Sequence, residues 1–291
     1  MEALHQFLIA PFTEFAFMQR GLLGAVLLSL SACPIGVFLM LRRMSLTGDA
    51  MAHAILPGAA AGFLLYGLQI VPMTIGGLLA GVIVALGAGA VSRLTIQKED
   101  ASMAAFYLIS LALGVTMVSL RGSSVDLMHV LFGTVLALNN DALSLIGIVA
   151  VVTLASLGLF WRALVAECLD PLFLRSVSKL GSPVHFIFLG LVVLNLVAGF
   201  QALGTLLSVG LMVLPAAAAR FWTQRVETMA MLAVAFGLVS SVSGLLLSYH
   251  AALPSGPAII LSTGCLYFVS VLFGPRGLLA TRRPRPAHRI A

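Results

Sequence analysis

The chain has 291 residues, of which 60% are apolar and only 9% are charged. A domain surrounded by water could not carry this balance without exposing a large hydrocarbon surface. The composition therefore excludes a water-soluble globular protein and predicts lipid as the main solvent. The formal net charge of +6 arises mainly from short loops and the C-terminal tail, which argues against a nucleic-acid partner.

About nine apolar runs, each near the roughly 20 residues that cross a bilayer as a helix, follow one another along the chain. They cover residues 17–41, 48–66, 72–91, 101–120, 142–164, 184–200, 204–221, 229–248 and 257–273. No linker rich in Pro, Gly or Ser separates two lobes, so residues 1–291 are expected to form one membrane domain. The sequence predicts an all-α, polytopic transmembrane helical bundle of about 8–9 spans.

The first run is expected to be a membrane span and not a cleaved signal peptide. It is too long for a signal, has no basic leader, and passes directly into Arg42 and Arg43 instead of a small-residue cleavage site. The segment before it, about 1–16, contains aromatic residues and Pro11, and we expect it to lie in the membrane interface.

The second run carries the most informative residues. Asp49 and His53 are four positions apart, so on a helix their side chains share one face, one turn apart, and could bind one ion. Gly48 permits unusual backbone angles, and Pro57 removes the hydrogen bond that would reach the carbonyl of His53. We therefore expect an interrupted helix, which occurs at membrane depth where the backbone lines a cavity.

A structural interpretation of this pair is also open. Asp49 could cap the helix after the preceding loop, and His53 could donate to a neighbouring carbonyl. An ionisable pair just inside an apolar segment is costly, however, and this cost favours a functional role. Oxygen and imidazole donors suit zinc, manganese or ferrous iron better than a sugar or a lipid.

Residues 44–58 match the pattern Met-Ser-Leu-x-Gly-Asp-Ala-x-x-His-Ala-x-Leu-Pro-Gly at every fixed place. With this motif the sequence resembles the ABC-type permeases of the zinc, manganese and iron import family. Further matches to that family run nearly from end to end, at residues 17–20, 99–101, 129–133, 201–204, 214–217 and 254–257.

The resemblance implies a homodimeric pore in a bacterial-type inner membrane. It further implies an extracytoplasmic metal-binding protein that delivers the ion and two cytoplasmic ATPase subunits that drive transport. The implied solute is a divalent metal ion, zinc in first place with manganese or iron as alternatives, and no permanently bound cofactor is expected. Asp49 and His53 occupy the signature positions that would meet the metal in transit.

ATP is expected to bind elsewhere, because the sequence contains no Gly-x-x-x-x-Gly-Lys-Ser/Thr phosphate loop. In an importer, the cytoplasmic segment at about 166–183 would dock on the ATPase. The expected coupling residues are Asp170, Leu172, Phe173, Arg175 and Gly181. Family members commonly place the Asp and the Gly closer together than in this chain. A solvated loop that merely links two spans is the alternative.

Other candidates are weaker. Asp126 and His129, three residues apart, and His250 could form an outer mouth that attracts a cation, although an interfacial helix with a capping Asp explains the first two equally well. Glu99 and Asp100 open a span and suit the positive end of its dipole. The three cysteines form no Cys-x-x-Cys pair, so neither a disulfide framework nor a thiolate metal site is indicated.

Basic residues predict the orientation, because short loops rich in Lys and Arg stay in the cytoplasm. They fall in every second connection and in the tail at about 275–291, which places the C-terminus in the cytoplasm and, with nine spans, the N-terminus outside. These residues are Arg42, Arg43, Arg93, Lys98, Arg162, Arg175, Lys179, Arg220 and Arg225, followed by five arginines in the tail.

Two rival functions remain open from the sequence. The first is a secondary metal transporter or channel that is driven by an ion gradient without an ATPase. The second is an intramembrane metalloenzyme that uses Asp49 and His53 as ligands, which the absence of a His-Glu-x-x-His motif and of a Ser/Lys catalytic pair disfavours.

Overall fold

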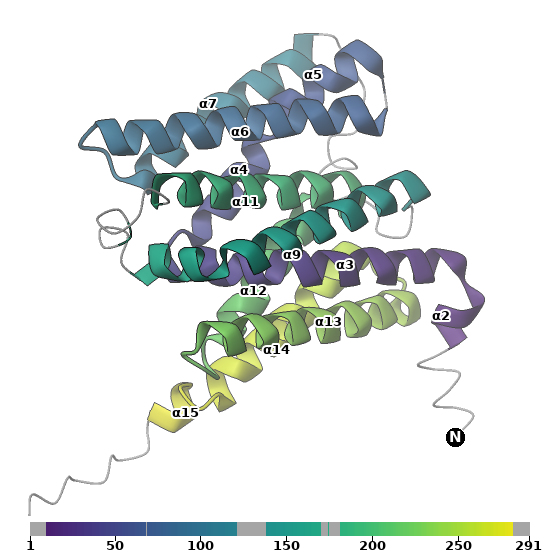
Figure 1. The fold of residues 1–291 in the computed structure, drawn as a ribbon. Coiled ribbons are helices and arrows are strands. Elements are labelled where there is room, and N and C mark those ends of the chain that lie inside the picture. Colours follow the sequence, from purple (N-terminus) through teal and green to yellow (C-terminus); the bar gives the residue numbers. More distant parts are fainter. Residues whose placement is uncertain (1–9, 68, 121–137, 170–173, 175–180, 282–291) are drawn as a thin grey trace, which may run out of the picture.

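The computed structural model describes residues 10–67, 69–120, 138–169, 174 and 181–281. Within these ranges the secondary structure is helical, without a strand, which confirms the predicted all-α class. The helices, shown in Figure 1, are α2 (Ala10–Glu14), α3 (Ala16–Leu41), α4 (Ser45–Ala54), α5 (Leu56–Tyr66), α6 (Ile70–Leu94), α7 (Glu99–Leu120), α9 (Asn140–Leu169), α11 (Gly181–Leu203), α12 (Thr205–Ala219), α13 (Val226–Ala251), α14 (Ser255–Phe273) and α15 (Leu278–Thr281).

Eight apolar helical segments within the described ranges are long enough to cross a bilayer, α4 and α5 together forming one of them. Every predicted run lies on a helix, and the predicted polytopic bundle is confirmed. The run at 204–221 becomes α12, which has only 15 residues. At the α-helical rise it covers about 22 Å, less than the hydrocarbon core of a typical bilayer. The span count is therefore at the lower end of the expected range.

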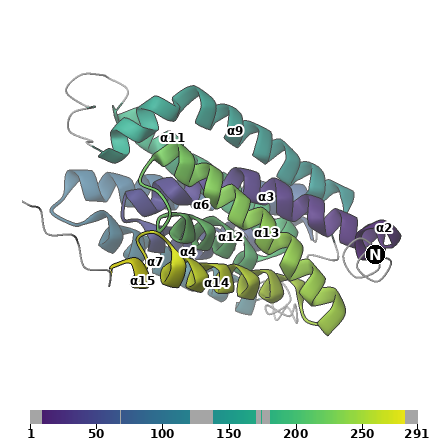
Figure 2. The ribbon, with the colours of Figure 1, turned by 90° about the horizontal axis from the view of Figure 1, so that it is seen from below.

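The two most buried long helices, α3 and α11, lie at the centre of the bundle. Figure 1 shows α5, α6 and α7 packed together on one side of them and α13 and α14 on the other. Figure 2 shows that α9 lies along a third side of the bundle, where it packs against α3 and α11. Helix α4 crosses between the groups and packs against α7, α11 and α12. It therefore connects the two sides of the bundle.

The peripheral helices expose long apolar side chains. Such residues project from α6, α7, α9 and α14, and they include Ile75, Leu79, Ile83, Leu108, Ile109, Ile148, Val151, Leu261 and Phe268. In water this surface would be a strong aggregation liability. In a bilayer it is the ordinary contact with lipid, so the exposed apolar surface agrees with the composition.

The predicted interruption of the second span is confirmed. Helix α4 ends at Ala54 and α5 begins at Leu56, with Ile55 between them and Pro57 in the first turn of α5. The other prolines behave differently, because Pro34 and Pro215 lie inside continuous helices. Pro215 cannot donate to the carbonyl of Leu211, and the Cys33 thiol donates to that carbonyl instead, at 3.1 Å.

The connections between helices lie at one end of the bundle or at the other. Figure 1 shows the α6–α7 and α12–α13 connections, the end of α3 and the start of α15 at the same end, whereas the α5–α6 and α13–α14 connections and α2 lie at the opposite end. The first group contains Arg43, Lys98, Arg220, Arg225 and Arg276. The grouping agrees with the alternation expected from the positive charges. The assignment of that end to the cytoplasm stays a prediction, as does the interfacial position of the segment that contains α2.

Helix α9 extends further than the sequence indicated. The predicted run ended at 164 and the coupling segment began at 166, but α9 continues to Leu169. The reason is that Glu167 is buried in the bundle, where it pairs with Arg42. The predicted docking segment would therefore begin after Leu169 instead of at about 166.

Helices α5 and α6 approach each other closely through glycines. A Cβ atom built on Gly58 would overlap the backbone carbonyl of Gly76, and a Cβ on Gly76 would overlap the carbonyl of Gly58. Small residues allow this kind of backbone contact, which replaces the hydrophobic effect as the source of helix association in lipid. The contact holds the second half of the interrupted span against α6.

We predict that Gly58→Ala lowers the stability of the purified protein by about 1–3 kcal/mol, because the added methyl group forces the two backbones apart. The melting temperature in detergent measures the effect. Gly158→Ala is the matched control, since Gly158 is also helical and a Cβ there meets no atom within 4 Å. An equal melting temperature for the two variants would contradict the prediction.

Candidate functional site

Asp49 and His53 lie one turn apart on α4, as their spacing predicts. The Nε2 atom of His53 is 3.8 Å from Oδ1 of Asp49. This is longer than a direct hydrogen bond. Two ligand atoms that share one ion at typical bond lengths lie at most about 4 Å apart. The side chains are therefore placed so that one ion can bridge them with little movement.

At the interruption, some of the backbone N–H and C=O groups form hydrogen bonds with one another. Pro57 has no N–H to donate to the carbonyl of His53, which suggested that this carbonyl would be free. The N–H of Ile55 instead points to the carbonyls of both Met51 and His53. The N–H of Ile55 thus closes the last turn of α4, and the candidate ligand atoms here are those of the Asp49 and His53 side chains.

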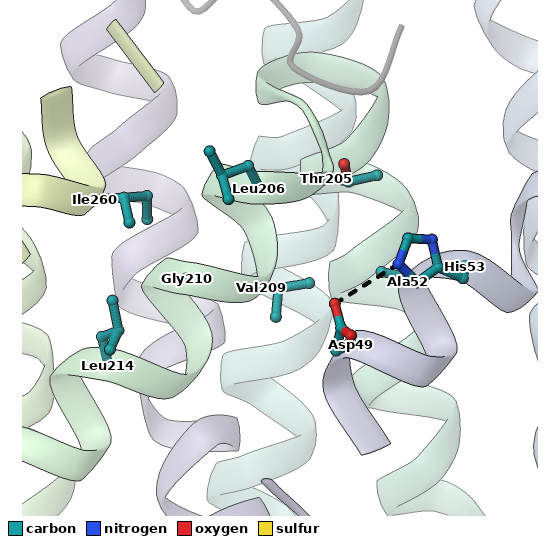
Figure 3. A pocket seen from close by; sticks show the side chains of 9 residues that line it. All are labelled: Asp49, Ala52, His53, Thr205, Leu206, Val209, Gly210, Leu214 and Ile260. Carbon is teal, nitrogen blue, oxygen red and sulfur yellow. Dashed lines mark ion pairs between the residues drawn. The ribbon is translucent and has the colours of Figure 1, made fainter. Parts of the chain in front are cut away.

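Both side chains line a cavity of about 400 Å³. Figure 3 shows Asp49 and His53 on α4, with residues of α12 across the cavity from them. The cavity is lined by Asp49, Ala52, His53, Thr205, Leu206, Val209, Gly210, Leu214 and Ile260. Its wall is mostly apolar with a few polar groups, a composition typical of sites that bind a small polar solute.

The pair is accessible from outside the chain. The Asp49 side chain is 68% exposed and that of His53 is 33% exposed, whereas Nδ1 of His53 is buried without a hydrogen-bond partner among the described residues. A carboxylate exposed between apolar helices requires water or another protein surface beside it, because contact with hydrocarbon is costly. The cavity therefore needs a polar or proteinaceous cover.

Sequence reasoning missed a second cavity on the other side of Asp49. It has a volume of about 220 Å³ and is lined by Thr47, Asp49, Ala50, Asp100, Met103, Ala104 and Tyr107. Asp100 lies in the first turn of α7, where its charge suits the helix dipole as expected, and it also faces this cavity. The Tyr107 ring lies 6.4 Å from that of His53. Asp49 thus borders both cavities.

The residues from α12 and α7 had no sequence signal of their own. Thr205, Val209 and Tyr107 are ordinary residues of apolar runs, and only folding brings them beside α4. A partial signal was Gly204, which separates α11 from α12 with a φ of 91°. A turn at this residue starts α12 at Thr205, in the wall of the first cavity.

One chain provides few metal ligands. Within the described residues, no group of three or more His, Cys, Asp or Glu side chains is placed to hold a metal ion. Asp49 and His53 offer two donor side chains. A divalent ion at this position must therefore complete its coordination with water or with groups from another chain.

Of the remaining predicted site residues, the structure describes His250 and Gly181, and neither lines this cavity. His250 lies in the last turn of α13, exposed and in ring contact with Tyr249. Gly181 begins α11. Outside the described residues lie Asp126, His129, Asp170, Leu172, Phe173 and Arg175. The roles expected for these residues stay predictions.

A family model described as the ABC 3 transport family matches residues 14–274. The chain is 33% identical over 271 residues to the manganese transport system membrane protein MntC of Listeria monocytogenes, covering 93% of this chain and 95% of that protein. It is 33% identical over 264 residues to the manganese import system permease protein ScaB of Streptococcus gordonii, covering 90% and 93%.

A solved structure, PsaBC from Streptococcus pneumoniae in complex with Fab, has a similar fold. The TM-score is 0.82 at 30% sequence identity, and the match covers 95% of this chain and 97% of that chain. The similarity in sequence and in structure therefore extends over nearly the whole length of the chain.

We predict that the cavity is aqueous and not filled by lipid. In a background without the three cysteines, Leu206→Cys should react with a charged, membrane-impermeant thiol reagent about tenfold or more faster than Leu154→Cys, because the thiolate forms only in contact with water. Leu206 lines the cavity and is 38% exposed, and Leu154 on α9 is 43% exposed. The two positions thus match in residue type and exposure. Equal labelling rates would contradict the prediction.

Proposed function

This chain belongs to the ABC 3 transport family, and from that premise we propose that it is the membrane subunit of an ATP-driven importer of divalent metal ions, in which Asp49 and His53 contact the ion in transit. The observation that carries the proposal is the placement of a carboxylate and an imidazole, 3.8 Å apart, in the wall of an accessible cavity between apolar helices.

The ligand chemistry suits transient binding. An ionised Asp49 and a neutral His53 supply one oxygen and one nitrogen donor, a set that first-row divalent metals accept. Two protein donors bind weakly compared with the closed four-ligand sites that hold structural metals. A site on a transport route has to release its ion, so a small ligand set is an advantage here.

The accessible position of the pair supports a homodimer. Manganese and similar ions prefer about six ligands, and one chain supplies two donor side chains at this cavity. A second copy related by a two-fold axis would bring a second Asp49 and His53 to the same ion and would cover the cavity. Water molecules would complete the coordination.

The two ends of the bundle indicate where each proposed partner protein would bind. The end of α9 and the start of α11, between which the predicted coupling residues fall in the sequence, lie at the end of the bundle that also holds the basic connections. We place two ATPase subunits there, in the cytoplasm, because the sequence has no phosphate-binding loop of its own. The extracytoplasmic metal-binding protein would dock at the opposite end.

Transport would proceed by alternating access. ATP binding draws the two ATPase subunits together, the coupling segments move with them, and the bundle changes which side reaches Asp49 and His53. The two cavities beside Asp49 support this proposal. Helix α12 walls one of them and α7 the other, so a shift of α4 between these neighbours would open one cavity and narrow the other.

We favour manganese as the transported metal. Two relatives with extensive similarity are named for manganese transport or import. The sequence motif alone favoured zinc, and the donor atoms of Asp49 and His53 do not separate the two metals. Zinc and iron are therefore the competitors to test.

Replacing either site residue by alanine should stop transport. We expect Asp49→Ala and His53→Ala to reduce ATP-dependent Mn²⁺ uptake by more than about tenfold, because each removes one of the two donor side chains. The measurement is uptake into proteoliposomes that contain the chain with its ATPase. Normal uptake in both variants would remove the site assignment.

Two controls accompany this experiment. Glu227→Gln removes an exposed carboxylate at the start of α13, away from both cavities, and should leave uptake unchanged. Omission of ATP tests the energy source. If the wild-type chain accumulates Mn²⁺ equally well without ATP under an ion gradient, the gradient-driven transporter replaces the ATP-driven importer.

A competition experiment tests the metal preference. Unlabelled Mn²⁺ should suppress uptake of radioactive manganese at a lower concentration than Zn²⁺ or Fe²⁺ does, if manganese is the physiological solute. The same proteoliposomes provide the assay, with the metal-binding partner protein added on the outside. Stronger suppression by Zn²⁺, together with ATP-dependent uptake of radioactive zinc, would reverse the preference.

A further inference from the structure

A buried ion pair joins three helix ends at the end of the bundle where α9 finishes and α11 starts. Arg42 directly follows α3, Glu167 lies in the last turn of α9, and His185 lies near the start of α11. One terminal nitrogen of Arg42, Nη2, lies 3.3 Å from Oε1 of Glu167 and 2.7 Å from Nδ1 of His185. The Arg42 guanidinium also lies 5.0 Å from the centre of the Phe188 ring.

All three polar side chains are withdrawn from solvent. The side chain of Arg42 is 9% exposed and that of Glu167 is 1% exposed, and His185 is buried. Arginine carries only donors, so Nδ1 of His185 is the acceptor in its contact with Arg42. Arg42 is therefore the group that holds the cluster together.

The ion pair between Arg42 and Glu167 engages only one of the two carboxylate oxygens. Arg42 contacts one oxygen of Glu167, and the other oxygen, Oε2, is buried without a hydrogen-bond partner in the described part of the chain. A guanidinium can engage both oxygens of a carboxylate through two parallel hydrogen bonds. The cluster thus has a second arrangement available, in which the same two groups form a bidentate pair.

Stability alone does not explain such a pair. Replacement of a buried ion pair by apolar residues of similar size is often neutral or stabilising, because both charges must lose their water. A buried pair that can exist in two discrete arrangements is better suited to defining the relative positions of helices.

The covalent connection from this cluster to the metal site is short and rigid. Helix α3 ends in a Schellman motif, in which the N–H of Met44 bonds to the carbonyl of Leu39 and the N–H of Arg43 bonds to the carbonyl of Met40. Arg43 has a φ of 60°, the left-handed conformation that this motif requires. Helix α4, which carries Asp49 and His53, starts at Ser45. A displacement of Arg42 would therefore displace α4 almost directly.

The other two members of the cluster flank the predicted coupling segment. Glu167 is three residues before Asp170, and His185 is four residues after Gly181. A displacement of that segment by a bound ATPase would act first on the ends of α9 and α11, where these residues lie. Arg42 contacts both of these residues, so it would be displaced with the two helix ends, and the chain connects it directly to α4.

We propose that Arg42, Glu167 and His185 form a joint that transmits movement of the coupling segment to α4 and so to Asp49 and His53. Arg42 is a positioning residue for transport and does not contact the metal. This inference rests on the proposed ATP-driven import. It adds the residues through which ATP hydrolysis acts on the metal site.

The diagnostic variant replaces the pair by apolar residues, Arg42→Met together with Glu167→Leu. The single changes are unsuitable, because each leaves one buried charge without its partner and destabilises the bundle. The double variant should assemble with the ATPase. The measurement is the amount of Mn²⁺ transported per ATP hydrolysed in proteoliposomes, and we expect this ratio to fall about tenfold, a typical size for a lost coupling between sites.

The matched control removes a different buried polar link, which joins α9 to α11. The Asn195 side chain on α11 donates to the Thr153 hydroxyl on α9 at 2.8 Å, away from the coupling segment. Thr153→Val with Asn195→Leu should keep the wild-type ratio of transport to hydrolysis. The comparison separates coupling from general packing of α9 on α11.

Each result decides the proposal. A ratio within about twofold of wild type in the Arg42 and Glu167 double variant, well inside the range of coupling effects, would overturn it. A parallel fall of uptake and hydrolysis, or failure of the complex to assemble, would also overturn it, because the cluster would then be a structural link only. Failure of the wild-type complex to show ATP-dependent uptake would instead remove the proposed function.

Discussion

In a hydrocarbon solvent every backbone N–H and C=O group has to be satisfied within the protein, and Pro57 removes one such hydrogen bond from the helix that carries Asp49 and His53. The chain interrupts that helix at Ile55 and closes α4 there. An interruption of this kind is tolerated only beside protein or water. The interruption at Ile55 therefore favours a neighbouring cavity and a polar pair of side chains. It also requires protein around it, which α7, α11 and α12 provide by packing against α4.

The wall opposite the pair depends on a second interruption. Gly204, with its positive φ, ends α11 and starts the short helix α12, so Thr205 and Val209 face the cavity. Helix α12 packs closely on α3, because a Cβ on Gly36 would overlap the backbone carbonyl of Met212. If one wall of the cavity moves during the proposed transport cycle, we expect it to be α4 and not α12, since α12 is held by close backbone contact with the central helix.

The sequence predicts the helices well and the site only in part. The long helices follow from apolar runs, since a hydrocarbon solvent leaves few alternatives, whereas the short helices α2 and α15 lie outside those runs. The interruption at Ile55 follows from Pro57. The Asp49 and His53 pair follows from helical spacing. Thr205, Tyr107 and Asp100 reach the cavities through helix packing, which no local pattern specifies. Glu167 falls within the cytoplasmic segment predicted at about 166–183, yet it lies on α9 and is buried. Its partner Arg42 is 125 positions away in the chain, so no local pattern indicates the pairing.

Arg42 has two features that a topological signal alone does not explain. A positively charged residue at the end of a span orients a chain in the membrane, and the exposed Arg43 suffices for this predicted role. Arg42, by contrast, is withdrawn from solvent and shared between the ends of α9 and α11. Of these adjacent arginines, one is exposed and the other is buried between helix ends. The joint proposed for Arg42 would give the buried charge a role that its cost of desolvation otherwise leaves unexplained.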